Sequence, residues 1–390
     1  MSIKTIKMNR HILLLLLLIN FCFANENNPL YVSSKSLPNY NQQNFSEYVN
    51  ENKQWLKDNR VFLSKNQNLE LSLNTPFERK PINQNVSKGI LLVHGLGDSP
   101  GYFEDLTQEL VSHGFLVRTV LLTGHGSKPA DLINVEFEEW ENLVSHHIKL
   151  LEKEVDELWL GGFSTGANLV TSYALENEKD ISGLLLFSPG FASNQDTLLP
   201  LSGIGTYFKT WLFQNDNSQN ILRYESLSMN ASNLYYKSLQ RVQEELENKS
   251  FSKPVFVTIS EDDSVIKAEE IVSIFSNNFK NPNSQLLWFG KKNSSNDNRI
   301  TSLSSYLPEE HIGNFSHLSV LFKKNHFFYG RNGSYKMFKN GQDKIYNEKE
   351  DELWYSAWGL KEEGKYFARL TWNPYFDKTI KLMSDVINSK

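Results

Sequence analysis

The chain has 390 residues, a formal net charge of −5, 39% hydrophobic residues and 13% aromatic residues. That apolar content is enough to fill the core of one α/β domain with insertions. The basic residues form no stripe and no long block carries a single sign of charge, which argues against nucleic acid as a partner. Cys22 is the only cysteine, so a disulfide framework is excluded.

The first 24 residues have the anatomy of a secretory signal peptide. A positively charged segment precedes an apolar run at 12–19, and Cys22-Phe23-Ala24 places small residues at positions −3 and −1 of a cleavage site. We therefore expect cleavage after Ala24 and export to the periplasm or the medium. The apolar run is shorter than the roughly 20 residues of a membrane span, so an uncleaved anchor is the weaker alternative. A lipid-attached Cys22 fits the preceding residues poorly. If cleavage removes Cys22, the mature protein has no cysteine, so a cysteine nucleophile and thiolate-bound zinc are excluded.

Residues 25–88 form a region distinct from the rest of the chain. Residues 25–44 are rich in Asn, Pro and Ser and predict a leader. Apolar positions in 45–60 recur with the spacing of an amphipathic helix. Residues 68–73 alternate between apolar and polar, which favours an edge strand. We expect a leader, a helix and an edge strand ahead of a catalytic domain that spans 89–390.

From Gly89 onward, apolar strands alternate with amphipathic helices, which predicts a mostly parallel sheet covered by helices on both faces. Residues 191–250 interrupt this alternation with a mostly helical pattern, and residues 291–316 interrupt it with a polar, Ser- and Asn-rich stretch. The expected strands are 89–93, 115–122, 157–163, 183–187, 254–259 and 284–289, and the expected helices are 102–113, 137–154, 165–178 and 375–387.

A candidate nucleophile stands where one of these strands meets a helix. Gly162-Phe163-Ser164-Thr165-Gly166 follows a strand and opens a helix. Such an elbow holds a serine in a strained conformation on a very tight turn, so the residues two before and two after it must be small. An ordinary glycine-rich turn has the same letters, but the strand before and the helix after favour Ser164 as a nucleophile.

The glycine-rich segment 94–100 follows an earlier strand, where an oxyanion loop is expected. We predict that the backbone N–H groups of Leu96 and Thr165 stabilise the negative charge that develops on a substrate carbonyl oxygen. His94 is expected to shape this loop rather than act as a base. His125, in Gly124-His125-Gly126, is expected to brace a turn by hydrogen bonds.

The acid and the base are expected later in the chain, in that order. A strand ending near Ile259 is followed by Glu261, Asp262 and Asp263, of which we select Asp263 as the acid. Three histidines follow, and His317 lies between small and apolar neighbours that suit a partly buried base. The alternatives are Asp262 and Glu261 for the acid, and His326 and His311 for the base.

These motifs together resemble the α/β-hydrolase superfamily, and most closely its branch of monoacylglycerol lipases and S33 serine aminopeptidases. The resemblance implies an ester or amide hydrolase with a cap at about 191–250. The sequence shows no metal-binding cluster and no phosphate-cradling loop, so we expect no cofactor and no metal. Asp263 and His317 are further apart than is usual in the family, because of the insertion at 291–316. The matching segments are 91–100, Thr123-Gly124-His125-Gly126, Gly162-Phe163-Ser164-Thr165-Gly166-Ala167, Asp263-Ser264-Val265 and Ser316-His317-Leu318.

The cap segment 198–213 is unusually apolar. It is expected either to pack the cap onto the core or to line an acyl pocket and touch a lipid surface transiently. An apolar lid favours a small acyl ester as the substrate, so we expect an exported esterase. A serine aminopeptidase is the alternative, supported by the acidic residues Glu244, Glu245 and Glu247. A non-catalytic binding protein of the same fold is the third hypothesis, and the sequence leaves the oligomeric state open.

Overall fold

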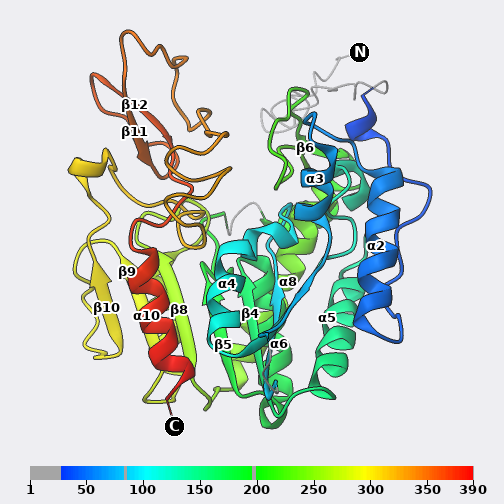
Figure 1. Cartoon of the computed structure of the whole chain (residues 1–390). Coiled ribbons are helices and arrows are strands. Elements are labelled where there is room, and N and C mark those ends of the chain that lie inside the picture. Colours follow the sequence, from blue (N-terminus) through cyan, green and yellow to red (C-terminus); the bar gives the residue numbers. More distant parts are fainter. Residues whose placement is uncertain (1–27, 83–85, 196–198, 390) are drawn as a thin grey trace, which may run out of the picture.

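The computed structural model describes residues 28–82, 86–195 and 199–389, so the expected signal peptide lies outside the described residues. Its core is an eight-stranded sheet in the order β1-β3-β2-β4-β5-β8-β9-β10 (Figure 1). Every neighbouring pair is parallel except β1 with β3. The strands are β1 Glu78–Arg79, β2 Lys88–Val93, β3 Phe115–Val120, β4 Glu157–Phe163, β5 Gly183–Phe187, β8 Val255–Ser260, β9 Gln285–Phe289 and β10 Ile300–Leu303.

Both faces of the sheet are buried, as near-continuous apolar strands require. Along β2, Leu91 and Val93 contribute to one hydrophobic cluster, whereas Ile90 and Leu92 contribute to the other. The first cluster is closed by α2, α5, α6, α8 and α9, and the second by α4 and α10. These helices are α2 Phe45–Asn59, α4 Glu104–Ser112, α5 Phe137–Glu152, α6 Thr165–Glu176, α8 Met229–Asn248, α9 Ala268–Asn278 and α10 Phe376–Ile387.

The prediction of an edge strand at 68–73 is wrong, because this segment is the helix α3 Gln67–Asn74. The side chain of Asn66 caps its first turn by accepting a hydrogen bond from the Leu69 N–H. Leu71 and Leu73 are buried on different sides, so a six-residue alternation fits a helix packed on two surfaces as well as a strand. The antiparallel edge strand is β1, ten residues further on.

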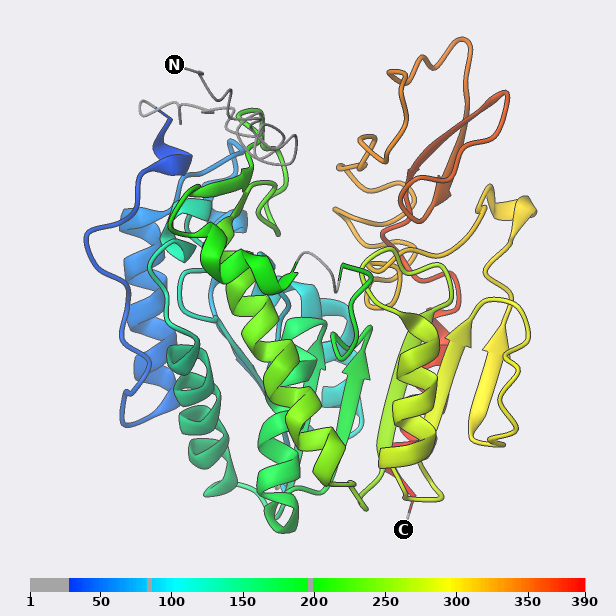
Figure 2. The ribbon, with the colours of Figure 1, turned by 180° about the vertical axis from the view of Figure 1, so that it is seen from behind.

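Two parts of the chain stand over the carboxyl ends of the strands (Figures 1 and 2). One is the segment between β5 and α8, where a mostly helical cap was expected. Its described residues include a 3-10 helix at Leu199–Leu201, the short helix α7 Ser202–Gly205, and a two-stranded sheet of β6 Trp211–Phe213 and β7 Leu227–Ser228 ahead of α8. The other follows His317 and contains the parallel pair β11 Glu352–Ser356 and β12 Lys365–Arg369, which the sequence did not predict.

The polar stretch 291–316, expected to be an insertion, also carries β10, which extends the sheet at its far edge. Among the described residues, no helix is both long enough and apolar enough to cross a membrane.

Candidate active site

Ser164 occupies the strained turn that its glycine neighbours predict. Its φ of 53° and ψ of −115° lie outside the backbone conformations that residues other than glycine prefer, and it directly precedes α6. A Cβ on Gly162 would lie 2.4 Å from the nitrogen of Ala167, and one on Gly166 would lie 1.9 Å from the carbonyl oxygen of Val93. Both positions therefore require glycine, and the resulting turn holds Ser164 at the carboxyl edge of the sheet.

The oxyanion loop lies directly against this turn. A Cβ on Gly95 would lie 3.2 Å from the Cβ of Ser164. Thr165 is the first residue of α6, so its N–H is one of the four that have no acceptor within the helix. Among the described residues, the N–H of Leu96 also has no hydrogen-bond acceptor. In the described part of the chain, neither predicted N–H group donates a hydrogen bond, so both are available to another acceptor.

His94 and His125 support the loop from behind, as predicted. The Nε2 of His94 accepts the N–H of Leu122 at 3.1 Å, and the Nε2 of His125 accepts the N–H of Gly97 at 2.9 Å. Burial lowers the pKa of His94 to about 4, and burial is also the largest cause that lowers the pKa of His125 well below its usual range. Both rings are therefore neutral and act as acceptors, which suits a structural role.

The structure brings Asp263 and His317 together. The Oδ2 of Asp263 lies 2.6 Å from the Nδ1 of His317, and its Oδ1 accepts the N–H groups of Val265 and Ile266 at 2.8 and 3.0 Å. Helix α9 begins at Ala268, so Asp263 lies in the loop before the helix and not in its first turn. The carboxylate is thus fully engaged in orienting one imidazole.

His317 also lies against the elbow. Its ring centroid is 5.0 Å from that of Phe163, the residue before Ser164. Its side chain is 6% exposed, and its Nε2 has no hydrogen-bond partner among the described residues. One ring nitrogen is therefore held by a carboxylate while the other is free to exchange a proton.

The alternative residues are engaged elsewhere. Glu261 accepts the N–H of Lys291 at 2.5 Å, and His311 stacks on Trp354. The Nδ1 of His326 accepts the N–H of Tyr329 at 3.0 Å. Burial raises the pKa of Asp262, and a hydrogen bond with the side chain of Asn314 opposes that rise.

Sequence reasoning missed several residues that hold the site. The hydroxyl of Ser188 donates to the carbonyl of His317 at 3.1 Å, and the amide of Asn194 donates to the carbonyl of Asp263 at 2.9 Å. Ser188 has a positive φ of 42°, which no sequence pattern indicates. Such single polar side chains on loops become visible only when the fold places them.

Asp98 and Arg223 form a further charged pair behind the oxyanion loop. Asp98 is 2% exposed, and its Oδ2 would lie 2.6 Å from a Cβ on Gly95. Burial raises its pKa, and the positive charge of Arg223 opposes that shift. The Nε of Arg223 lies 3.7 Å from the Oδ1 of Asp98. The segment that carries Arg223 also contacts the loop directly, because the N–H of Tyr224 donates to the carbonyl of Gly97 at 2.8 Å.

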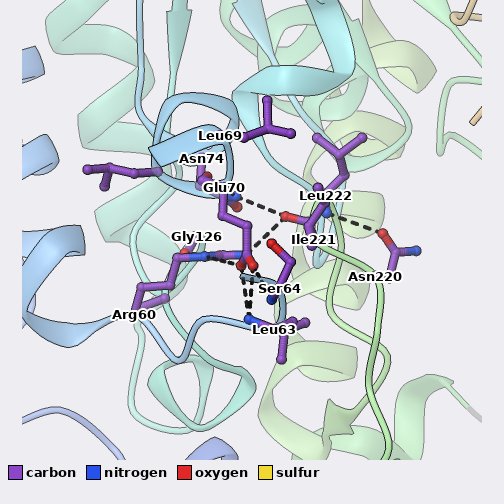
Figure 3. Close-up of polar contacts among 12 residues, drawn as sticks. Arg60, Leu63, Ser64, Leu69, Glu70, Asn74, Gly126, Asn220, Ile221 and Leu222 are labelled. Carbon is purple, nitrogen blue, oxygen red and sulfur yellow. Dashed lines mark hydrogen bonds and ion pairs between the residues drawn. The ribbon is translucent and has the colours of Figure 1, made fainter. Parts of the chain in front are cut away.

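A buried network fixes this segment to the N-terminal helices (Figure 3). Arg60 donates to Glu70 through Nε at 3.1 Å and Nη2 at 2.9 Å, and to the carbonyls of Gly126 and Ile221. The amide of Asn74 donates to the same Ile221 carbonyl at 2.9 Å. The region before the catalytic domain is therefore part of the framework around the site.

Among residues 28–82, 86–195 and 199–389, no group of three His, Cys, Asp or Glu side chains could hold a metal ion. The site instead consists of a serine on an elbow, a loop with free amide donors and a carboxylate-held imidazole, all at the carboxyl edge of a mostly parallel sheet. Together with this sheet, the arrangement defines an α/β-hydrolase fold.

The comparison with protein families agrees with this class. The model of the family "Serine aminopeptidase, S33" matches residues 84–289, more than half of the chain. The chain therefore belongs to the S33 serine aminopeptidase family.

A thermostable monoacylglycerol lipase from Bacillus sp. (strain H-257) is 29% identical over 102 residues, which are 26% of this chain and 40% of the relative. The chain thus matches less than half of that relative's length. A solved structure of a monoacylglycerol lipase from Paleococcus ferrophilus is 20% identical, with a TM-score of 0.44, and the match covers 55% of this chain and 88% of the other. A structure reported with the metagenome-derived lipolytic enzymes LipS and LipT is 19% identical, with a TM-score of 0.48, and covers 55% and 86%.

Proposed function

We propose that the protein is an exported serine hydrolase that cleaves carboxylic esters with lipid-like or short acyl groups. The observation that carries the proposal is the 2.6 Å contact between Asp263 and His317, beside the elbow that presents Ser164. The similarity to a monoacylglycerol lipase supports an ester as the substrate.

In the proposed reaction, His317 removes the proton of the Ser164 hydroxyl as its oxygen attacks the ester carbonyl. The N–H groups of Leu96 and Thr165 stabilise the negative oxygen of the tetrahedral intermediate. His317 then gives the proton to the departing alcohol, which leaves an acyl group on Ser164. Asp263 holds the imidazole in one tautomer and stabilises its charged form. Water, activated by the same histidine, releases the acid and regenerates the serine.

The cap supports an amphiphilic substrate. Large apolar side chains in 201–213 are exposed rather than packed onto the core, including Tyr207 at 88% and Phe208 at 85%. The expectation that this stretch mainly packs the cap is wrong for these residues, whereas Trp211 is buried. Exposed apolar groups of this kind suit a lipid surface or the acyl chain of an aggregated substrate.

The acidic residues that suggested a peptide substrate lie far from the nucleophile. Glu244 and Glu247 are in the last turns of α8, which ends at Asn248 just before β8 begins. They are therefore near the amino ends of the strands, whereas Ser164 follows the carboxyl end of β4. Glu245 is paired with Arg241 and Lys249. This placement favours an ester over a peptide with a free amine.

The test uses purified protein with 4-nitrophenyl esters of rising chain length and with aminoacyl nitroanilides. We expect ester hydrolysis, labelling of Ser164 by a fluorophosphonate, and loss of both in Ser164→Ala. Ser172→Ala in the same helix is the matched control and should keep both. Absence of ester hydrolysis and of labelling refutes the proposal, and preferential cleavage of the anilides establishes an aminopeptidase. N-terminal sequencing of the exported protein tests cleavage after Ala24.

Lipid contact has its own test. Tyr207→Ser and Phe208→Ser should weaken binding to phospholipid vesicles while turnover of soluble 4-nitrophenyl butyrate persists. Equal vesicle binding by the native and substituted proteins contradicts a role of this surface.

A further inference from the structure

Two arginines from separate parts of the chain converge beside the candidate site. Arg223 belongs to the cap region and Arg369 is the last residue of β12. Their chain segments are linked through Tyr329, whose hydroxyl donates to Asn220 at 2.8 Å and whose carbonyl accepts the hydroxyl of Thr371 at 2.6 Å. The two cations are close enough for the charge of Arg223 to contribute to lowering the pKa of Arg369 to about 10, although burial is the larger cause.

Arg223 is adjacent to the oxyanion loop but keeps hydrogen-bond donors unused. Its distance of 3.7 Å to Asp98 is too long for a hydrogen bond, although the charges attract. Its side chain is 32% exposed, whereas that of Asp98 is 2% exposed. The carboxylate is therefore enclosed behind the loop, whereas part of the Arg223 side chain is exposed and its guanidinium also hydrogen-bonds with the side chain of Tyr102.

The backbone of the next residue, Leu370, connects Arg369 to the segment that carries the base. The carbonyl of Leu370 accepts the hydroxyl of Ser316 at 2.5 Å, and Ser316 directly precedes His317. The Nε of Arg369 donates to the amide oxygen of Asn340 at 2.5 Å. Its guanidinium lies 5.1 Å from the ring centroid of Trp358, and in the described part of the chain neither Nη1 nor Nη2 has a hydrogen-bond acceptor.

The nearby carboxylates form no ion pair with Arg369, although the negative charge of Asp263 favours its charged form. Asp98 is paired with Arg223, and both oxygens of Asp263 are taken by His317 and by backbone N–H groups. Among the described residues, no ion pair joins Arg369 to a carboxylate. A partly buried guanidinium without a counter-ion is costly to maintain, and its free fork matches the two oxygens of a carboxylate.

We propose that Arg369, with Arg223 beside it, forms an anion subsite that binds a carboxylate group of the ester substrate. The inference rests on the proposed ester hydrolysis and specifies its substrate class, namely half-esters of dicarboxylic acids or esters of hydroxy acids. The apolar cap would then contact the uncharged part of the same molecule. A peptide with a positively charged amine would be repelled from this position.

Two pairs of soluble substrates test the subsite. Mono-4-nitrophenyl adipate and 4-nitrophenyl hexanoate differ by a carboxylate on the acyl side, and 4-acetoxybenzoate and 4-acetoxybenzamide differ on the alcohol side. In at least one pair, we expect the anionic member to have the higher kcat/KM by about tenfold, as for a partly exposed charged hydrogen bond. The pair that shows the preference identifies the side of the ester that carries the charge.

Substitutions then assign the preference to Arg369. Arg369→Gln should bring the ratio of the two kcat/KM values close to one, and Arg369→Lys should give an intermediate ratio because it keeps the charge without the fork. Lys361→Gln removes one exposed positive charge from the same part of the chain and should keep the native ratio. A native ratio at or below one in both pairs, or an unchanged ratio in Arg369→Gln, overturns the proposal.

A binding measurement separates this proposal from the proposed function. If no ester is hydrolysed and Ser164 is not labelled, ester hydrolysis is refuted, but calorimetric titration with adipate still tests the subsite. Binding of adipate to the native protein and its loss in Arg369→Gln support the subsite. Absence of binding refutes it. Circular dichroism and thermal unfolding of each variant show whether the protein is folded.

Discussion

Replacing Glu70 by glutamine would remove the negative charge from the buried ion pair with Arg60. The side chain of Arg60 is 3% exposed and that of Glu70 is fully buried. Glu70 accepts two hydrogen bonds from the guanidinium, together with the N–H groups of Leu63 and Ser64 (Figure 3). A glutamine amide would turn an N–H donor toward some of these donors and leave the arginine charge uncompensated in the interior.

Breaking a buried pair on one side costs about 3–5 kcal/mol. This is a large share of the roughly 5–15 kcal/mol by which folded proteins are stable. Arg60 also donates to the carbonyls of Gly126 and Ile221, so both the turn at 123–126 and the segment carrying Arg223 should loosen. We therefore expect Glu70→Gln to unfold with a lower urea midpoint than the native protein. Tryptophan fluorescence measures the unfolding.

The double variant Arg60→Met/Glu70→Met should recover most of the loss, because neither charge is then left unpaired. Asp343→Asn, which breaks the exposed pair with Lys361, is the control and should leave the midpoint nearly unchanged. The reasoning is refuted if Glu70→Gln lies within about 1 kcal/mol of the native protein, or if the double variant is no more stable than the single one.

Three further changes test other parts of the framework. Asp263→Asn can still accept the two loop N–H groups but no longer fixes the tautomer of the base, so kcat should fall by about 10³–10⁴-fold with the fold intact, measured on 4-nitrophenyl butyrate. Gly166→Ala places a methyl group 1.9 Å from the carbonyl oxygen of Val93, so both stability and activity should fall. The free energy of unfolding, measured in urea, should decrease by at least about 1–3 kcal/mol. Burial lowers the pKa of His94 to about 4 and that of His147 to about 3, so the unfolded chain binds protons below about pH 6.5 that the folded chain does not. The free energy of unfolding should therefore fall by ~1.4 kcal/mol per pH unit for each histidine as the pH drops from about 6.5 to 4, and a flat profile in urea unfolding would contradict this.

The sequence predicted most of the parallel sheet because its signals are local. A buried parallel strand is a short apolar run, and the elbow needs glycine at fixed distances from Ser164. The segment 68–73 was ambiguous because its leucines suit a strand or a helix that packs on two surfaces. Strands β11 and β12 were missed because they are short and form a separate two-stranded sheet outside the central one.

The candidate site likewise contains residues that local sequence signals identify and residues that they do not. Ser164, Asp263 and His317 follow strand ends or lie in recognisable motifs, so their selection needed only the order of elements. Arg223 lies in an irregular region and Arg369 at the end of the short strand β12, and nothing within a few residues of either one marks it. Their proximity to the site depends on long-range contacts, such as those of Tyr329, which a single sequence does not reveal.

Asp263 and His317 are 54 positions apart, and the path of the chain between them explains how such regions can be added without displacing either residue. The chain leaves the sheet after β8, forms β9 and β10 at the sheet edge, and returns to the same edge. The hydroxyl of Ser260 fixes the returning loop by donating to the carbonyl of Phe315 at 2.8 Å. Because the return point is anchored in this way, the length of the excursion does not affect the position of His317. The sheet edge can therefore carry the proposed triad while the cap and the C-terminal region each carry one arginine of the proposed anion subsite.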